Sequence, residues 1–131
     1  LRLAAAHDVG RVLNPQTLAG QIYGALAQGV GYTLYEEVQS EKGRILNPDF
    51  RDYKLPGASE MNFPVDLDFI ETCDEAGPFG AKGCGEGAFA GVIGAIATAV
   101  ADAGVPVNAL PLTPERVWRS IRQAKQEEDG S

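Results

Sequence analysis

The sequence predicts an α+β fold, in which short mixed strands pack with two long helices rich in small residues and with a C-terminal helix. Segments with helical periodicity and segments with strand-like alternation follow each other in an order too irregular for a doubly wound sheet. The 131 residues suit one domain. About a quarter of them are Leu, Ile, Val or Phe, which argues against a disordered chain. We therefore expect one domain over residues 1–131, with a polar tail at 126–131.

The first part of the chain predicts a strand and then a long helix. Residues 1–12 are apolar without helical periodicity, so we expect a strand with His7-Asp8 inside it or at its end. Asn14 is a favourable N-cap, and Pro15 suits the first helical position because its missing N–H has no intrahelical partner there. The helix should continue to about Val38. Its apolar stripe recurs every four residues: Leu18, Ile22, Leu26, Val30 and Leu34.

A second flank of this helix is polar and small. Gln21 and Gln28 are seven positions apart and fall about 20° from one another around the helix axis. Gly20, Gly24 and Gly31 lie on the same flank. Because glycine weakens a helix interior relative to alanine, we expect this flank to meet a ligand or another part of a protein.

The middle of the chain predicts short strands and a long loop. Ser40–Ile45 contains a Lys42-Gly43 turn and suggests two short strands. Residues 47–64 are rich in proline and are expected to form a loop. Val65–Thr72 alternates apolar and acidic side chains, which predicts a strand with one face in water.

Two further helices are expected after a glycine-rich loop at Gly77–Gly85. The first runs from about Glu86 to Ala103. Its shared apolar face consists of Phe89, Val92, Ile93, Ile96 and Val100. Thr113-Pro114 begins the last helix, before a polar end expected to fray. The residues expected to be buried on it are Val117, Trp118 and Ile121.

Charge and composition limit the partners. The net charge is −7 and basic residues do not cluster, so nucleic acid and anionic membranes are poor partners. The apolar stretch 88–100 is too short to span a bilayer, and no signal-peptide pattern is present, so we expect a cytoplasmic protein. Cys73 and Cys84 have neither CxxC nor zinc spacing and are interpreted as reduced thiols. With His7 the single histidine, we expect no metal ligands in this chain.

The glycine-rich loop is the densest candidate site. Its glycines permit close approach of a ligand, and the helix that follows offers free N–H groups and the positive end of its dipole. Lys82 adds a cation, so the loop suits an oxyanion, and Glu86 lies at the same helix start. Two other interpretations remain open. The loop is a tight connection with an ordinary first-turn acid, or Gly83–Ala88 is a dinucleotide fingerprint, which would require a βαβ unit around it.

Several motifs occur together in the order typical of one family. The chain resembles the molybdenum hydroxylases, which include xanthine dehydrogenases, aldehyde oxidoreductases and the large subunits of aerobic carbon monoxide dehydrogenases. The resemblance covers nearly the whole chain. It is carried by His7–Pro15, Gly20–Gly24, Ala27–Gly31, Asp52-Tyr53, Leu55-Pro56, Glu71-Thr72, Gly80–Glu86 and Leu112–Trp118.

The resemblance implies a fragment of the molybdenum-cofactor-binding domain, from the C-terminal part of the molybdopterin-binding subunit. It implies insertion of a water-derived oxygen at an electron-poor C–H of a heterocycle or aldehyde, with Glu86 as catalytic base. The cofactor would be molybdenum-molybdopterin, in its plain or its cytosine dinucleotide form. The implied cofactor contacts are Gly20, Gln21, Lys82, Gly83, Cys84 and Gly85.

The resemblance also implies partners. These are the remainder of the molybdenum subunit, further domains or subunits that carry iron–sulfur clusters and FAD, and a small-molecule substrate. Two cysteines cannot ligate even one [2Fe–2S] cluster, so electron transfer requires another polypeptide segment. We expect the isolated chain to be inactive. The alternative function is a non-catalytic binding or assembly module that retains this fold.

Overall fold

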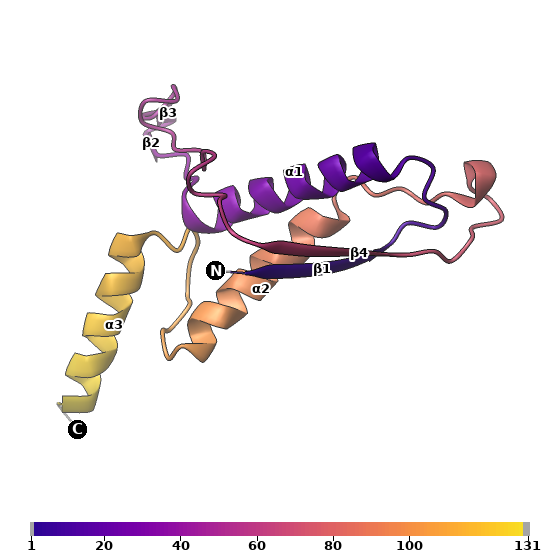
Figure 1. Ribbon diagram of the computed structural model, residues 1–131. Helices are drawn as coiled ribbons and strands as arrows, with labels where there is room; N and C mark the ends of the chain where they lie inside the picture. The colour runs from indigo at the N-terminus through magenta and orange to yellow at the C-terminus, as the bar shows by residue number, and fades with distance from the viewer. Residues whose placement is uncertain (1, 130–131) are drawn as a thin grey trace.

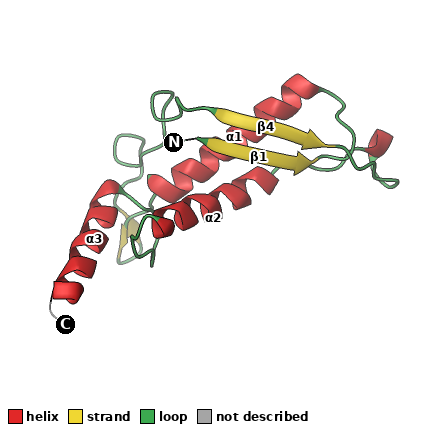
Figure 2. Cartoon of the chain, turned by 60° about the horizontal axis from the view of Figure 1, so that its bottom comes forward, coloured by secondary structure: helices red, strands yellow, loops and turns green. Residues whose placement is uncertain are grey.

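The computed structural model describes residues 2–129 as a two-stranded sheet lying over two helices, with a third helix that projects from this body (Figures 1 and 2). This arrangement confirms the predicted α+β class. The elements are β1 (Leu3–Asp8), α1 (Pro15–Leu34), β2 (Ser40–Glu41), β3 (Arg44–Ile45), β4 (Val65–Ile70), the 3₁₀ turn η1 (Pro78–Gly80), α2 (Gly87–Asp102) and α3 (Pro114–Asp129).

The sheet pairs strands from distant parts of the sequence. β1 and β4 are parallel, in a register that begins at Leu3 opposite Val65 and ends at Asp8 opposite Ile70. Burial alternates along both strands, so one face of the sheet packs on the helices and the other faces solvent. β2 and β3 form the expected short hairpin, and its turn residues Lys42 and Gly43 have φ of 49° and 82°.

The core lies between the sheet and the crossing of α1 with α2. The predicted stripe of α1 is confirmed at its centre, where Ile22, Leu26 and Val30 are buried, whereas its two ends are half-buried. The cluster is completed by Ala25 of α1 and by Ala88, Val92 and Ile96 of α2. A ring contact between Tyr32 and Phe89, with centroids 5.9 Å apart, adds to the same crossing.

Gly29 lets the two helices approach each other. A Cβ atom at this position would clash with Cγ1 of Val92 and lie 3.1 Å from the carbonyl oxygen of Phe89. Val92 cannot move aside easily, because a β-branched side chain has essentially one rotamer in a helix. The sequence placed Gly31 on the flank expected to meet a ligand or another part of a protein, and Gly31 is buried against Glu36 and Pro56 of the same chain.

The element boundaries differ from the prediction where the backbone turns. The first strand ends at Asp8 rather than residue 12, since Gly10 has φ of +68°. Asn14 caps α1 as expected, with its side-chain oxygen accepting from the Thr17 N–H at 3.1 Å. α1 ends at Leu34 rather than about residue 38, where two successive N–H groups both donate to the Gly31 carbonyl.

The predicted burial of α3 is wrong for Trp118, whose exposed fraction is 55%, while Val117 and Ile121 are half-buried. The reason is that α3 extends away from the core (Figure 1), so its apolar side finds no matching element among residues 2–129. An ion pair between Arg116 and Glu37 ties its first turn to the segment after α1. α3 continues to Asp129, so most of the polar end expected to fray is helical, and residues 130–131 lie outside the described residues.

The crossing at Gly29 can be tested by matched alanine substitutions in α1. Gly29→Ala should lower the free energy of unfolding by about 1–3 kcal/mol, because it places a methyl group against Val92 and backbone. Gly24→Ala is the control, since a Cβ at Gly24 meets nothing within 4 Å. It should raise the free energy of unfolding by about 0.5–1 kcal/mol. Urea unfolding followed by circular dichroism measures both, and equal effects would contradict the close crossing.

Candidate functional site

The glycine-rich loop is anchored at the carboxyl ends of β1 and β4. Nζ of Lys82 lies 2.6 Å from Oδ2 of Asp8, the last residue of β1, and donates to Oγ1 of Thr72 at 2.6 Å. The Thr72 hydroxyl in turn donates to Asp8. The backbone N–H of Lys82 donates to the carbonyl of Val9 at 2.9 Å. Side-chain and backbone bonds therefore fix the same loop residue.

This arrangement keeps the Asp8 carboxylate charged. Hydrogen bonds from Lys82, from Thr72 and from the Gly10 N–H hold the pKa of Asp8 well below its usual range. The two side chains of the ion pair are 34% and 37% exposed. The Lys82 ammonium group binds Asp8 and Thr72. Its charge therefore holds the loop in place and is not available to bind an anion.

Two glycines allow the loop to lie directly on neighbouring backbone. A Cβ at Gly10 would clash with the carbonyl oxygen of Gly80 and lie 2.7 Å from the Lys82 nitrogen. A Cβ at Gly80 would clash with Sγ of Cys73. Both residues also have positive φ, +68° and +85°, which L side chains rarely adopt. Glycine is therefore required at both positions for two separate reasons.

The structure brings three of the six expected cofactor contacts, Gln21, Lys82 and Cys84, to one cleft. Nε2 of Gln21 on α1 donates to the carbonyl of Gly85 at 3.2 Å, which joins the helix to the loop. Gly83 and Gly85 face open space, since a Cβ at either would meet nothing within 4 Å, and the same is true of Gly20. A cleft of about 340 Å³ lies between the loop and α1. Its lining includes Gln21, Lys82 and Cys84.

Glu86 lies at the junction of the loop and α2. It occupies the N-cap position of α2, but its side chain makes no capping hydrogen bond. The residue is exposed, and its carboxylate has no hydrogen bond or ion pair within residues 2–129. Glu86 is thus an exposed carboxylate without a partner among residues 2–129, beside an open loop.

The dinucleotide interpretation is wrong, because its structural context is missing. The fingerprint at Gly83–Ala88 does not follow a strand directly, since β4 ends at Ile70 and the turn η1 intervenes. No strand follows α2 within the described residues. A βαβ unit around this motif is therefore absent from residues 2–129.

Sequence reasoning missed the residues that hold the loop. The sequence placed Asp8 and Thr72 in strands and in motifs of the family resemblance without a role in the loop, yet together they bind Lys82. The short spacing of Asp8 to Gly10 is a usable signal, because the Asp8 carboxylate accepts from the Gly10 N–H at 3.0 Å in a local turn. The pairing with Lys82 spans the chain and has no local signature.

Residues 2–129 contain no cluster of three or more His, Cys, Asp or Glu side chains arranged to hold a metal ion. None of their helices has the length and apolar character needed to cross a membrane.

Comparison with known proteins gives consistent similarities. Residues 1–62 match the family model of the molybdopterin cofactor-binding domain. The chain is 43% identical over 125 residues to the gamma subunit of the 6-hydroxypseudooxynicotine dehydrogenase complex of Paenarthrobacter nicotinovorans, in an alignment covering 90% of this chain and 15% of the relative. It is 35% identical over 126 residues to a xanthine dehydrogenase molybdenum-binding subunit of Escherichia coli O157:H7, covering 94% and 17% respectively.

Solved structures show the same similarity. Quinoline 2-oxidoreductase from Pseudomonas putida 86 aligns with a TM-score of 0.81 and 34% identity, covering 91% of this chain and 16% of that one. Carbon monoxide dehydrogenase from Oligotropha carboxidovorans aligns with a TM-score of 0.84 and 28% identity, covering 95% and 16%. The chain therefore spans roughly a sixth of the proteins it matches.

The Asp8 ion pair predicts a dependence of stability on pH. Because the folded-state pKa of Asp8 is lowered, charged Asp8 stabilises the fold above its unfolded-state pKa, and this stabilisation is lost as the pH falls through the folded-state pKa. Between about pH 5 and pH 2, the melting temperature of the wild type should fall more steeply than that of Asp8→Asn. Thermal unfolding at a series of pH values measures the difference.

The control for this prediction is Glu75→Gln. Glu75 is an exposed acid with no hydrogen bond or ion pair within residues 2–129, so its neutral variant should keep the wild-type slope. Parallel curves for Asp8→Asn and the wild type would show that the ion pair does not stabilise the loop.

Proposed function

Because this chain belongs to the molybdenum hydroxylase family, as part of a molybdopterin-binding subunit, we propose that it supplies the catalytic base and part of the cofactor pocket of a molybdenum-dependent hydroxylase. In this proposal residues 1–131 are the C-terminal part of that subunit. The observation that carries the proposal is the free carboxylate of Glu86 at the junction of an open glycine loop and a helix.

The glycine loop and the facing side of α1 leave room for a large cofactor. Gly83 and Gly85 leave the loop backbone open to close approach, and Gly20 does the same on α1. Gln21 adds an amide at the edge of the cleft. When bound, the molybdenum-molybdopterin cofactor would supply a redox-active metal and the water-derived oxygen that is inserted at the substrate carbon.

Gln21 has a specific task in this pocket. Its Nε2 is held by the Gly85 carbonyl at 3.2 Å, so the orientation of the amide is fixed before a ligand arrives. The amide oxygen is then left to accept a hydrogen bond from the cofactor. Lys82 contributes its backbone, since its ammonium is bound to Asp8. Cys84 is half-buried against the core, and this packing positions the loop.

Glu86 acts as the base. One of its carboxylate oxygens takes the proton from the oxygen nucleophile, which makes that oxygen a stronger nucleophile toward an electron-poor carbon. Because the side chain is exposed, it can afterwards release the proton to water.

The substrate and partners of the whole enzyme follow from the similar proteins. One is named for quinoline and another for 6-hydroxypseudooxynicotine, which supports a small heterocycle as the substrate class, with an aldehyde as the other option. We propose that electrons leave through iron–sulfur clusters and FAD on other domains or subunits, because this chain has only two cysteines.

The role of Glu86 is tested by Glu86→Gln in the assembled enzyme. Gln keeps the shape of the side chain but does not accept the proton, so the rate of substrate oxidation should fall by about 10² to 10⁴. Molybdenum content should stay normal, because Glu86 makes no bond that holds the loop. Stopped-flow measurement of the reductive half-reaction, with metal analysis of the same sample, gives both values.

Glu75→Gln is the matched control, because it removes an exposed acid between β4 and the loop without altering the loop–helix junction. A near-wild-type rate in a fully loaded Glu86→Gln enzyme would exclude the base role. It would favour the alternative, a binding or assembly module that lacks a catalytic residue.

The role of Gln21 is tested against its neighbour on the same flank. Gln21→Ala should lower molybdenum content, because it removes the bond to Gly85 and leaves a polar group of the cofactor without its partner. Gln28→Ala should retain the cofactor, since Gln28 is exposed and has no hydrogen bond within residues 2–129. Metal analysis after gel filtration compares them. Equal molybdenum content in both variants would mean that Gln21 is only a helix surface residue.

A further inference from the structure

The candidate base has a cation close to it in the sequence. Lys82 is the only basic residue of the segment 55–115, and Glu86 follows it by four positions. Two of the three residues between them are glycines, which leave the backbone free to bend. A lysine side chain is also long and flexible. The sequence therefore allows the Lys82 ammonium to pair with the Glu86 carboxylate.

The fold gives this ammonium a different partner. Nζ of Lys82 lies 2.6 Å from Oδ2 of Asp8 and donates to Oγ1 of Thr72 at 2.6 Å. Asp8 also accepts from the Thr72 hydroxyl and, at 3.0 Å, from the Gly10 N–H. The bond from Lys82, followed by those from Thr72 and Gly10, holds the pKa of Asp8 well below its usual range. Lys82 therefore meets a fixed partner that is fully charged at neutral pH.

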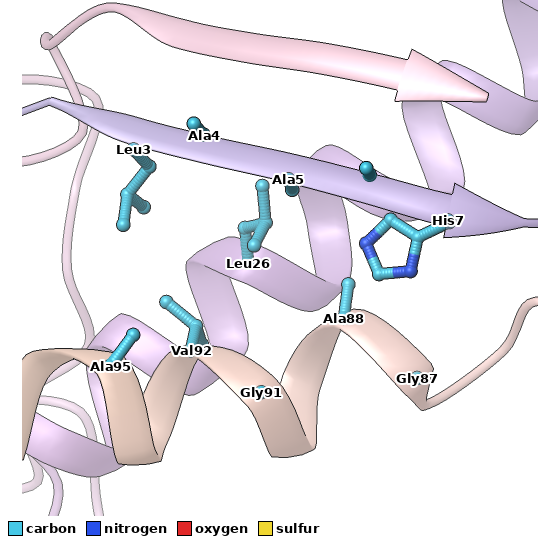
Figure 3. Close-up of a pocket in the computed structure, with 11 residues that line it drawn as sticks. Leu3, Ala4, Ala5, His7, Leu26, Gly87, Ala88, Gly91, Val92 and Ala95 are labelled. Atoms are coloured by element: carbon cyan, nitrogen blue, oxygen red, sulfur yellow. The ribbon is translucent and has the colours of Figure 1, made fainter. Parts of the chain in front are cut away.

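Asp8 lies on the side of β1 that faces away from α2. Burial alternates along the strand, so His7 belongs to the helix-facing series and Asp8 to the exposed series. His7 points toward the first turn of α2 (Figure 3), and a Cβ at Gly87 would lie 3.9 Å from its Nδ1. The start of α2, which carries Glu86, is therefore close to the end of β1, while Asp8 holds the ammonium on the opposite side of the strand.

Glu86 is left unpaired as a result. Its carboxylate has no hydrogen bond or ion pair within residues 2–129. Two other basic side chains lie in this region: His7 beside the start of α2, and Arg11 in the cleft that Lys82 also lines. Neither is paired with Glu86. A carboxylate that already binds an ammonium is harder to protonate, and it is a weaker base than an unpaired one.

We propose that Asp8 is a positioning residue for catalysis, which binds the Lys82 ammonium away from α2 and so keeps Glu86 unpaired and able to accept a proton. This inference rests on the proposed function of Glu86. Thr72 assists Asp8, because its hydroxyl accepts from the same ammonium. The alternative is that the ion pair only anchors the loop. Loss of either partner would then be equally harmful, whereas the proposal makes loss of Asp8 worse than loss of Lys82.

The test compares single and double variants of the assembled enzyme, with substrate oxidation rates divided by molybdenum content. Asp8→Asn frees Lys82 to bind Glu86 and should lower the rate by about tenfold or more. Lys82→Met removes the ammonium and should be faster than Asp8→Asn. The double variant Asp8→Asn/Lys82→Met should recover to within about threefold of Lys82→Met. A double variant as slow as Asp8→Asn, or a near-wild-type rate in Asp8→Asn, would overturn the proposal.

Thr72→Val is a milder variant for the case in which Asp8→Asn does not assemble. It removes one of the two oxygens that hold the ammonium and keeps the size of the side chain. Its rate should fall by about twofold to tenfold, and adding Lys82→Met should reverse this loss. A loss that persists without the ammonium would overturn the proposal. Glu75→Gln is the matched control, since it removes an exposed acid near the loop without freeing Lys82, and it should keep the wild-type rate.

A zero-length cross-link locates the ammonium without measuring activity. A water-soluble carbodiimide joins a lysine to a carboxylate that it contacts, with loss of one water. Peptide mass spectrometry should find Lys82 joined to Asp8 in the wild type and to Glu86 in Asp8→Asn. Absence of the link to Glu86 in Asp8→Asn would overturn the proposal. A wild-type rate in Glu86→Gln would instead overturn the base role, and the cross-link would still show which carboxylate holds Lys82.

Discussion

The contact between Gly10 and the backbone of residues 80–82 determines the geometry of the site. It brings the end of β1 so close to the loop that no side chain fits between them. The same approach places the Lys82 ammonium within 2.6 Å of Asp8, and the backbone bond from Lys82 to Val9 closes the connection. The position of the loop then sets where Gln21 meets Gly85 and where α2 begins.

Glycines in this chain serve two opposite purposes, and the space around each one separates them. Gly29 and Gly80 are surrounded by atoms, and both let parts of the chain pack closely. Gly83, Gly85 and Gly91 have empty space where a side chain would stand. The glycines surrounded by atoms stabilise the isolated fold because they allow close packing. The glycines beside empty space weaken it slightly, and no contact within the fold compensates. Open glycines therefore indicate where a ligand or another segment is expected to approach.

Local features of the fold were predictable from sequence, and long-range pairings were not. The Asn14 cap, the alternation of Val65–Thr72 and the buried centre of the first helix depend on neighbouring residues. The pairing of β1 with β4 and the ion pair of Lys82 with Asp8 join segments more than sixty residues apart and leave no local pattern. Trp118 was misjudged because helical periodicity marks an apolar face without saying which element covers it.

The residue types along the loop identified the candidate site from the sequence. The separate role of each residue, however, is apparent only from the fold. The sequence indicated that Lys82 is a ligand-binding cation, but in the fold its ammonium group pairs with Asp8. The fold also places Glu86 at the end of α2 nearest β1, because a Cβ at Gly87, the residue after Glu86, would lie 3.9 Å from Nδ1 of His7.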